Sequence, residues 1–203
     1  MAAKVIARLR QEARVARRAL PRAARRSGAA ALTDRILALP EVDALPPGGI
    51  VAGFMAFDGE IDVGPAMRAL GASGFEIALP RIDADAVTFH LAAEPGADGG
   101  DLVPAAMVPG RFGILEPTPN QPRADRLGLV LVPLVAFDAQ CHRIGMGRGY
   151  YDRFFADWPT RPPLIGVAFD AQQVDSIPAR RWDVSLDAVV TPSHTHRSGR
   201  PRN

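Results

Sequence analysis

Residues 127–137 read LGLVLVPLVAF, the most hydrophobic run of the chain. A short, continuous run of Leu and Val is typical of a strand that is buried on both faces of a sheet. Similar runs occur in GIVAGFMAF (49–57), FEIALP (75–80) and PLIGVAF (163–169). Because helical patterns separate these strands, the sequence predicts a largely parallel sheet covered on both faces, an α/β fold of three layers.

The helical patterns lie before and between these strands. Residues 3–20 carry a regular apolar stripe that ends at Pro21, and ALTDRILALP (31–40) and VGPAMRALGASG (63–74) predict two further helices. An arginine-rich N-terminus also suits a transit peptide, but the stripe fits a folded helix equally well. We therefore treat the segment as part of the folded protein.

The remaining segments complete a single predicted domain. AVTFHL (86–91) alternates as a strand exposed on one face does, and residues 92–126 are rich in Gly and Pro, which is typical of surface excursions. No internal repeat or low-complexity linker divides the chain. We predict one domain over residues 1–192 and a disordered polar tail over 193–203.

Composition excludes several classes of protein. No apolar run approaches the roughly 20 residues of a membrane span, and the N-terminus has no apolar core of a secretory signal. Cys141 is the single cysteine, so an intrachain disulfide is impossible and a reducing, cytoplasmic setting is expected. The four histidines are too dispersed for a zinc site. We expect a cytoplasmic monomer.

Charge is distributed unevenly along the chain. Residues 1–26 hold nine Lys or Arg and a single acid, Glu12, while the segment from 27 to 191 is net acidic. A basic helix of this kind either faces an anionic ligand or partner, or docks on its own acidic domain. The sequence leaves both interpretations open.

The stretch RIGMGRGYYDRFF (143–155) follows the central strand, at the sheet edge where α/β folds bind ligands. In its first part, residues 143–149, here called the glycine loop, three glycines occupy alternate positions, which lets backbone N–H groups approach an anion. Arg143 and Arg148 add positive charge. The spacing is neither a P-loop nor a dinucleotide fingerprint, so a tight structural turn remains an alternative to phosphate binding.

Two aspartates are candidate metal ligands. Asp152 lies in the first turn of the helix after the glycine loop, where it interacts favourably with the helix dipole. If phosphates bind nearby, it can instead hold a bridging Mg²⁺. Asp183, in RRWDVSLDAVVT (180–191), is a second candidate, with a cap or turn as the alternative.

A third acid, Glu60, follows the turn Asp58-Gly59 at the end of a predicted strand. There it can accept hydrogen bonds from the amino groups of a heterocycle, or it is a solvated loop acid. Met55 and Phe57 alternate on the strand that leads to it, so one of them can line the same pocket.

Apolar side chains complete the candidate site. Of Tyr150 and Tyr151, one can stack on a flat heterocycle while the other packs inward. Met146, between two glycines, offers an exposed apolar contact. Phe154, Phe155 and Trp158 have the helical spacing of core residues. Cys141 has no histidine and acid constellation beyond the adjacent His142, so it is not expected to be a nucleophile.

These motifs together resemble one family. RIGMGRGYYDRFF, the preceding LVPLVAFDAQCHRIG (131–145), FMAFDGEID (54–62) and RRWDVSLDAVVTP (180–192) closely resemble 5-formyltetrahydrofolate cyclo-ligases, in order from about residue 30 to 193. The resemblance implies a NagB/RpiA/CoA-transferase-like fold. It also implies an ATP- and Mg²⁺-dependent ring closure of 5-formyltetrahydrofolate to 5,10-methenyltetrahydrofolate, with release of ADP and phosphate.

The resemblance also implies roles for individual residues. ATP contacts would come from Lys4, Arg8, Arg143, Ile144, Gly145, Met146, Gly147, Arg148, Gly149, Tyr150 and Tyr151. Folate contacts would come from Met55, Glu60, Met146, Gly147, Arg148, Gly149 and Tyr150. Magnesium would be held by Asp152 and Asp183, and Arg148 and Tyr151 would be catalytic.

The N-terminal helix allows two alignments with the family. The family places a lysine four residues before an arginine, a spacing that Lys4 and Arg8 keep. Aligning on Leu9-Arg10 instead puts Ile6 at the position of the lysine. The sequence does not decide which basic residues reach ATP.

The implied mechanism begins with phosphorylation of the formyl oxygen, because a formamide oxygen is a poor leaving group. The ring-closing nitrogen then attacks the activated carbon, and phosphate departs. Such a site works by positioning and charge stabilisation. Two alternatives remain: a paralogue that acts on another substrate, and a nucleic-acid-binding protein that uses the basic helix. No RNP-like, KH or zinc pattern supports the second alternative.

Overall fold

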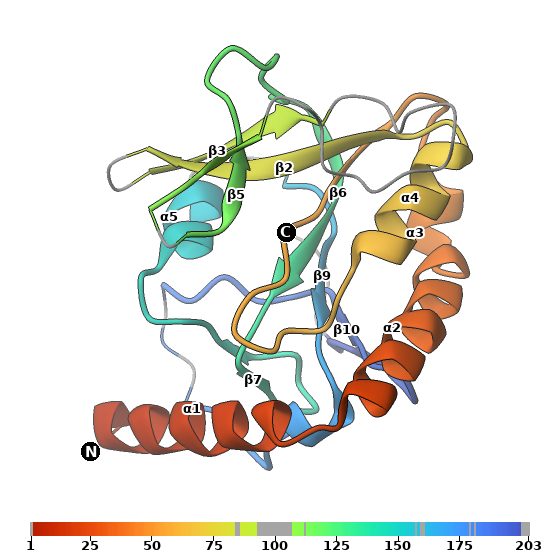
Figure 1. The fold of residues 1–203 in the computed structure, drawn as a ribbon. Coiled ribbons are helices and arrows are strands. Elements are labelled where there is room, and N and C mark those ends of the chain that lie inside the picture. Colours follow the sequence, from red (N-terminus) through yellow and green to blue (C-terminus); the bar gives the residue numbers. More distant parts are fainter. Residues whose placement is uncertain are drawn as a thin grey trace.

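The computed structural model describes residues 2–83, 86–92, 107–111, 113–156, 158, 161–178, 180 and 182–199. A seven-stranded sheet forms the centre, in the order β11-β10-β9-β6-β1-β2-β3 (Figure 1). Its strands are β1 (Ile50–Ala52), β2 (Glu76–Asp83), β3 (Ala86–Leu91), β6 (Leu127–Pro133), β9 (Leu164–Val167), β10 (Ala188–Val190) and β11 (Thr195–Arg197). Strands β10, β9, β6, β1 and β2 run parallel, whereas β3 and β11 pair antiparallel at the two edges. The predicted α/β fold with a largely parallel sheet is confirmed.

Helices cover both faces of this sheet (Figure 1). The helices are α1 (Ala2–Arg18), α2 (Arg22–Leu37), α3 (Pro40–Asp43), α4 (Gly64–Ala72), α5 (Tyr150–Ala156) and the short 3₁₀ helix η1 (Asp170–Gln172). Helices α2, α3 and α4 share one hydrophobic core with the sheet, and α5 packs in a second core on the opposite face. Helix α1 lies at one end of the sheet, beside β7 (Ala136–Phe137). In the described part of the chain, no helix is both long enough and apolar enough to span a membrane.

Strand β6 shows why the central run is apolar throughout. Leu129 and Leu131 are fully buried in the core with α2 to α4, while Val130 and Val132 are fully buried in the core with α5. Because successive side chains of a strand point to opposite faces, a strand covered on both faces must be apolar at every position.

The sequence analysis predicts one strand over residues 127–137, and this prediction is wrong. The run forms two strands, because β6 ends at Pro133 and β7 begins at Ala136. Proline has no N–H group with which to continue a ladder. The carbonyls of Leu134 and Val135 accept hydrogen bonds from the Gln172 amide instead of from a strand. The short strand β7 then pairs with β8 (Arg143–Ile144), which brings the glycine loop back to the end of β6.

Helix α2 begins at Arg22, nine residues before the predicted start of a helix at residue 31. Its first turns lack large apolar residues, so the hydrophobic pattern does not reveal them. The buried face uses Gly28 and Ala29 instead. A Cβ on Gly28 would lie 3.0 Å from the ring of Phe169, so small residues allow this close packing.

Residues 195–197, which the sequence analysis assigns to a disordered tail, form the edge strand β11. Its polar character suits an edge that is exposed on one side. Arg197 donates to Glu41 at 2.7 Å, and the Ser198 amide donates to the Asp187 carbonyl at 3.0 Å. These contacts anchor the segment to the sheet and to α3.

The Gly- and Pro-rich segment 92–126 lies partly outside the described residues. Its described part includes β4 (Met107–Pro109) and β5 (Leu115–Pro117), which pair antiparallel. Strand β5 lies beside β2: Arg81 donates to the Pro117 carbonyl at 3.0 Å, and the Ile82 amide donates to Glu116 at 3.2 Å. This segment therefore forms a wall beside the sheet.

Candidate functional site

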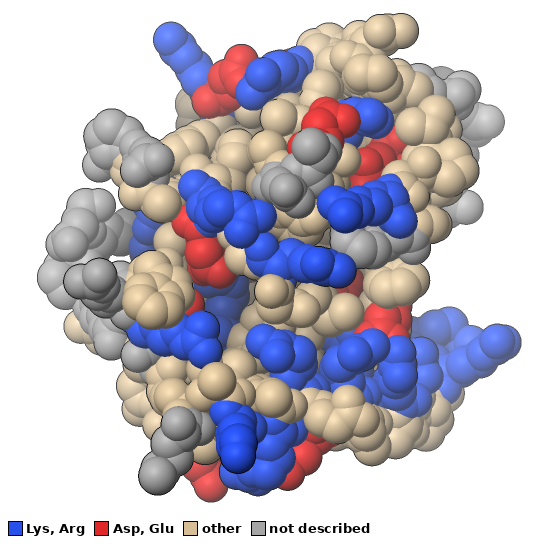
Figure 2. All heavy atoms as spheres, turned by 90° about the vertical axis from the view of Figure 1, so that its left-hand side faces the viewer, with Lys and Arg blue, Asp and Glu red and all other residues tan. Residues whose placement is uncertain are grey.

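A pocket of about 910 Å³ lies beyond the carboxyl ends of β1 and β6. Its walls come from α1, the loop after β1, strands β2 and β5, the glycine loop with α5, and the loop before β10. Figure 2 faces the side of the molecule on which α5 and the N-terminal end of α1 lie, and Lys and Arg side chains gather on this side. The pocket thus combines a basic surface with apolar walls.

The structure brings most of the predicted site residues together. The pocket is lined by Met55, Glu60, Asp183 and the whole stretch from Arg143 to Asp152. These residues are separated by up to 128 positions in the sequence, and the parallel sheet unites them because the loops after its strands meet at one edge.

Lys4 and Arg8 are the exceptions, because neither lines the pocket. Arg8 is exposed and pairs with Glu12 at 2.9 Å. Ile6 and Arg10 take their place in the wall, and Arg10 Nε donates to the Gly145 carbonyl at 2.9 Å. The packing of Leu9 explains why Ile6 and Arg10 line the pocket. Leu9 is buried beside the segment around β7, and this orients the helix face with Ile6 and Arg10 toward the pocket. Of the two alignments of α1, the geometry therefore favours the one on Leu9-Arg10.

The three glycines of the glycine loop have different physical roles. Gly147 (φ +91°) and Gly149 (φ +65°) are in the left-handed region, where glycine is strongly favoured. Gly145 is not in that region, and a Cβ built on it would meet no atom within 4 Å. Two glycines therefore make the turn, while the third keeps space open on the pocket wall.

Among the described residues, two groups donate to Asp152, and both donate to its Oδ1 atom. Arg143 donates to it at 2.7 Å and the Val184 amide donates at 3.2 Å. Helix α5 has only seven residues, so the charge near Asp152 comes chiefly from this arginine and less from a helix dipole.

Asp183 closes a turn, since its Oδ2 accepts from the Arg180 amide at 2.9 Å. Among the described residues no group of three or more His, Cys, Asp or Glu could form a metal cage. Two carboxylates on one pocket do fit Mg²⁺, which usually takes one or two carboxylates together with substrate phosphates and water.

Glu60 is not a solvated loop acid, because its side chain is only 12% exposed. Its Oε2 accepts from the Phe57 amide at 3.1 Å, and its Oε1 lies 3.8 Å from Arg17 Nη1. Burial raises the pKa of this carboxyl to about 7, although the Phe57 amide and the Arg17 charge favour the ionised form. Glu60 can therefore gain or lose a proton near neutral pH.

This pKa predicts how stability depends on pH. Protons bind Glu60 more tightly in the folded protein than in the unfolded chain, so its contribution to stability decreases as pH rises from about 4.5 through 7. Glu60→Gln removes the titration. Between pH 5 and 8, we expect wild type to lose about 2–3 kcal/mol of unfolding free energy relative to this variant. Urea unfolding at both pH values measures the difference, and parallel pH profiles would contradict the buried carboxyl.

The two tyrosines point to different surroundings. Tyr151 packs inward with an edge contact to Phe89 at 6.3 Å between ring centroids, and its buried hydroxyl has no hydrogen-bond partner in the described part of the chain. Burial, with the nearby Glu60 charge, raises its pKa, so the hydroxyl stays protonated. Tyr150 lies under the Arg153 guanidinium at 5.4 Å. Phe155 is buried in the core with α5, as predicted.

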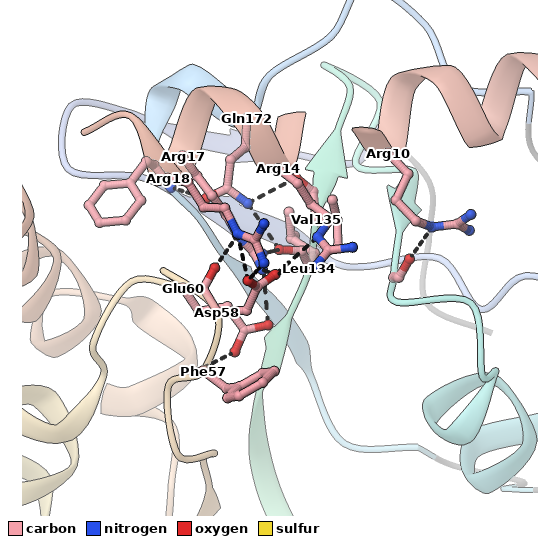
Figure 3. Close-up of polar contacts among 12 residues, drawn as sticks. Arg10, Arg14, Arg17, Arg18, Phe57, Asp58, Glu60, Leu134, Val135 and Gln172 are labelled. Carbon is pink, nitrogen blue, oxygen red and sulfur yellow. Dashed lines mark hydrogen bonds and ion pairs between the residues drawn. The ribbon is translucent and has the colours of Figure 1, made fainter. Parts of the chain in front are cut away.

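The basic helix docks on its own domain through Asp58. The Asp58 carboxylate accepts from Arg14 at 3.0 Å, from Arg17 at 2.9 Å and from Arg18, and its side chain is 5% exposed (Figure 3). We call these four residues the Asp58 cluster. Three of the nine basic residues at the N-terminus thereby form ion pairs with the protein's own Asp58. This arrangement disfavours the nucleic-acid interpretation of the helix.

Cys141 is fully buried, and burial raises the pKa of its thiol to about 11. The adjacent His142 donates from Nδ1 to Asp138 Oδ2 at 2.9 Å. A thiol this weakly acidic carries almost no thiolate at neutral pH. Because Cys141 also does not line the pocket, we do not expect it to be a nucleophile.

Sequence reasoning left one pair of pocket residues undecided and missed others. Ile6 and Arg10 belong to one of two alignments of α1 that the sequence left open, because the helical pattern does not show where Leu9 packs. Trp182 lines the rim and is 61% exposed, with the Arg180 guanidinium 5.8 Å from its ring centroid. Trp182 could have been suggested from the sequence, because it is a large aromatic residue directly before the candidate ligand Asp183. Arg17, which lies 3.8 Å from Glu60 but does not line the pocket, left no signal, because its neighbours in the sequence do not distinguish it from exposed arginines.

Comparisons with known proteins show which family the chain is similar to. A family model described as "5-formyltetrahydrofolate cyclo-ligase family" matches residues 2–192, which include the whole pocket. The 5-formyltetrahydrofolate cyclo-ligase of Escherichia coli (strain K12) is 36% identical over 151 residues, covering 70% of this chain and 78% of that protein. The Saccharomyces cerevisiae enzyme of the same name is 31% identical over 156 residues, covering 69% and 74%. Among solved structures, the 5,10-methenyltetrahydrofolate synthetase of Aquifex aeolicus has a TM-score of 0.78 at 26% identity, covering 98% of this chain and 95% of that one.

Proposed function

Because the chain belongs to the 5-formyltetrahydrofolate cyclo-ligase family of enzymes, we propose that its pocket binds ATP and 5-formyltetrahydrofolate together and closes the folate ring. The products are 5,10-methenyltetrahydrofolate, ADP and phosphate. The observation that carries this proposal is that one pocket joins the buried acid Glu60 to the glycine loop and its arginines. A substrate that must be phosphorylated has to meet ATP in such a shared space.

The folate end of the pocket contains Met55, Glu60 and the stretch from Met146 to Tyr150. The Glu60 carboxylate accepts hydrogen bonds from the amino groups of the pterin. Met55 is partly buried against the core with α2 to α4, while Met146, which also lines the pocket, is 46% exposed. A flat heterocycle between apolar walls, held at one edge by an acid, is an ordinary arrangement for a small-molecule site.

The nucleotide lies along the glycine loop, from Arg143 to Tyr151. Arg10 contributes to nucleotide binding in place of Lys4 and Arg8, because its side chain lies against the glycine loop. Its Nε donates to the Gly145 carbonyl, and its guanidinium lies 3.5 Å from where a Cβ on Gly147 would be. Asp152 and Asp183 would hold Mg²⁺, which would supply charge neutralisation during phosphoryl transfer.

The chain's own residues position the reactants and stabilise charge. Arg148 stabilises the charge on the phosphoryl group as it moves to the formyl oxygen, and the neutral Tyr151 hydroxyl donates a hydrogen bond in the same region. The ring-closing nitrogen then attacks the activated carbon, and the bond between that carbon and its phosphorylated oxygen breaks to release phosphate. No covalent bond to the enzyme forms, which agrees with the high thiol pKa of Cys141.

One incubation tests this function. The protein is mixed with 5-formyltetrahydrofolate, ATP and Mg²⁺, and the absorbance of the methenyl product is followed together with ADP. We expect both to appear in equal amounts. ADP formation with another substrate, and no methenyl product from folded protein, would instead identify a paralogue with a different substrate.

The glycine loop provides a prediction that separates folding from binding. Gly145→Ala should leave the unfolding free energy within about 0.5 kcal/mol of wild type, since φ is ordinary and the space is empty. The added methyl group enters the ligand space, so we expect KM for ATP to rise about tenfold.

Gly147→Ala is the matched control, because φ is +91° there and the variant is strained. It should lose about 1 kcal/mol or more of stability. Thermal unfolding and ATP titration of both variants measure the contrast. Equal loss of stability in the two variants would show that Gly145 is also a structural glycine.

A further inference from the structure

Arg17 is a fully buried arginine in the last turn of α1. Its Nε donates to the Asp58 carbonyl at 3.1 Å and its Nη2 to the Asp58 carboxylate at 2.9 Å. Its Nη1 lies 3.4 Å from the Leu134 carbonyl and 3.8 Å from Glu60 Oε1 (Figure 3). One guanidinium therefore joins α1, the loop that carries Glu60, and the pocket wall after β6.

The loop itself needs an external support. Asp58 (φ +55°) and Gly59 (φ +79°) are two consecutive residues in the left-handed region, and this tight turn places Glu60 directly after it. Arg14 and Arg18 also hold Asp58, but of the three arginines it is Arg17 whose guanidinium also lies beside Glu60. Arg17 is thus the member of the Asp58 cluster that connects the anchor of the loop to its functional acid.

Helix α1 carries a second contact with the pocket on the same face. Arg10 and Arg17 are seven residues apart, which is about two helical turns and roughly 10 Å along the axis. Arg10 holds the Gly145 carbonyl of the glycine loop, and Arg17 holds the Glu60 loop. The helix therefore spans both halves of the pocket.

We propose that Arg17 is a positioning residue for the reaction: it holds the Glu60 carboxylate where the pterin binds and favours its ionised form. The proposal rests on the proposed role of Glu60 in binding folate. Besides the Phe57 amide, which donates to Glu60 Oε2, three side chains in the described structure face this carboxyl and influence its charge. They are Arg17 from α1, Asp58 from the same loop and the neutral Tyr151 hydroxyl from α5. Arg17 is the cation among them, so its removal leaves less carboxylate at neutral pH.

The first test needs no ligand. The ¹³C NMR signal of the Glu60 carboxyl is followed during a pH titration. This signal is assigned as the one that is missing from the spectrum of Glu60→Gln. In Arg17→Met, we expect the midpoint of this titration to move to higher pH. In Arg18→Met, which removes another arginine from Asp58 but not the partner of Glu60, we expect an unchanged midpoint. An unchanged midpoint in Arg17→Met would overturn the proposal.

The second test separates position from charge by steady-state kinetics. Lysine keeps the charge of Arg17 but not the planar fork that reaches Asp58 and Glu60 together. We therefore expect Arg17→Lys to keep the wild-type titration and to raise KM for 5-formyltetrahydrofolate about tenfold, with KM for ATP and kcat little changed. Arg17→Met should also move the acidic limb of the pH profile of kcat/KM upward. Should Arg17→Met fail to fold, Arg17→Lys carries the kinetic test.

The variants together distinguish this role from a purely structural one. In a Glu60→Gln background, Arg17→Lys should raise KM for folate hardly further, because the two residues act as a unit. Equal increases in KM for folate and ATP, matched by Arg18→Met, would mean that Arg17 only stabilises the fold and would contradict the proposal. If wild type does not turn over 5-formyltetrahydrofolate at all, the proposed function fails, while the NMR titration still decides whether Arg17 controls Glu60.

Discussion

Asp152→Asn is expected to lower kcat for methenyl formation on the order of 100-fold or more while the protein stays folded. Charge stabilisation by a metal is worth several kcal/mol in a transition state, and each 1.4 kcal/mol corresponds to a factor of ten in rate. The asparagine Oδ1 can still accept from Arg143 and from the Val184 amide, both of which donate to Asp152 in the wild type. The substitution therefore removes the charge and preserves the local geometry.

Two measurements check the metal role of Asp152. The rate is followed across a Mg²⁺ titration, where the variant should need a higher Mg²⁺ concentration for half-saturation. Urea unfolding should show a loss of only about 1–2 kcal/mol, the typical cost of weakening one charge-assisted hydrogen bond.

Asp125→Asn provides the matched control, since Asp125 is exposed, pairs with Arg123 and lies outside the pocket wall. It should leave both the rate and the Mg²⁺ dependence unchanged. Wild-type turnover in Asp152→Asn, with an unchanged Mg²⁺ dependence, would remove the metal role from this residue.

Asp58→Asn is expected to destabilise the fold by about 3–5 kcal/mol, a typical cost of removing one partner from a buried ion pair. The variant leaves the fully buried Arg17 without its carboxylate. Asparagine tolerates the left-handed region, so the φ of +55° at this position adds little strain. The effect therefore measures the charge and not the turn.

The pH dependence of this effect has the opposite sign to that of Glu60. Burial opposes ionisation of Asp58, but hydrogen bonds from Arg18, Arg14 and Arg17 outweigh it and hold the pKa below its usual range. The stabilisation is therefore present above the usual carboxyl range and is lost as pH falls through the folded-state pKa. Urea unfolding at neutral and acidic pH should show the difference between Asp58→Asn and wild type shrinking in acid.

Glu12→Gln is the control for Asp58→Asn. It removes the partner of Arg8 in a pair whose side chains are both more than half exposed. Solvent screens such a pair, so the loss should stay below about 1 kcal/mol. A similar small loss in Asp58→Asn would show that the Asp58 cluster does not stabilise the fold as a buried pair.

The roles of the glycine loop and of the loops that carry Glu60 and Asp183 were predictable, because each is encoded in a short stretch of sequence. A strand followed by alternate glycines, and then by Tyr150 and Asp152, carries its meaning in a dozen residues. The rule that loops after parallel strands meet at one edge then predicts that Glu60 joins them. For these residues the sequence predicted the pocket, and the structure places them in it.

The face that α1 presents to the pocket was not predictable in the same way. Lys4 and Arg8 keep the spacing of the family, yet Ile6 and Arg10 line the wall. The helical pattern is satisfied by either register. The choice depends on where Leu9 finds its partners, and these lie more than 120 residues away, at Val135 and Ile144.

The sequence by itself determined the α/β class, the buried central strand and the residue types that meet at the pocket, because each of these follows from periodicity or from a short motif. Only the tertiary structure decided which arginines face inward. Arg17, Arg14 and Arg18 look alike in the sequence, but one is fully buried and another largely exposed. A charged side chain becomes part of a core only when a partner from elsewhere in the chain compensates its desolvation, and here that partner is Asp58, about 40 residues away.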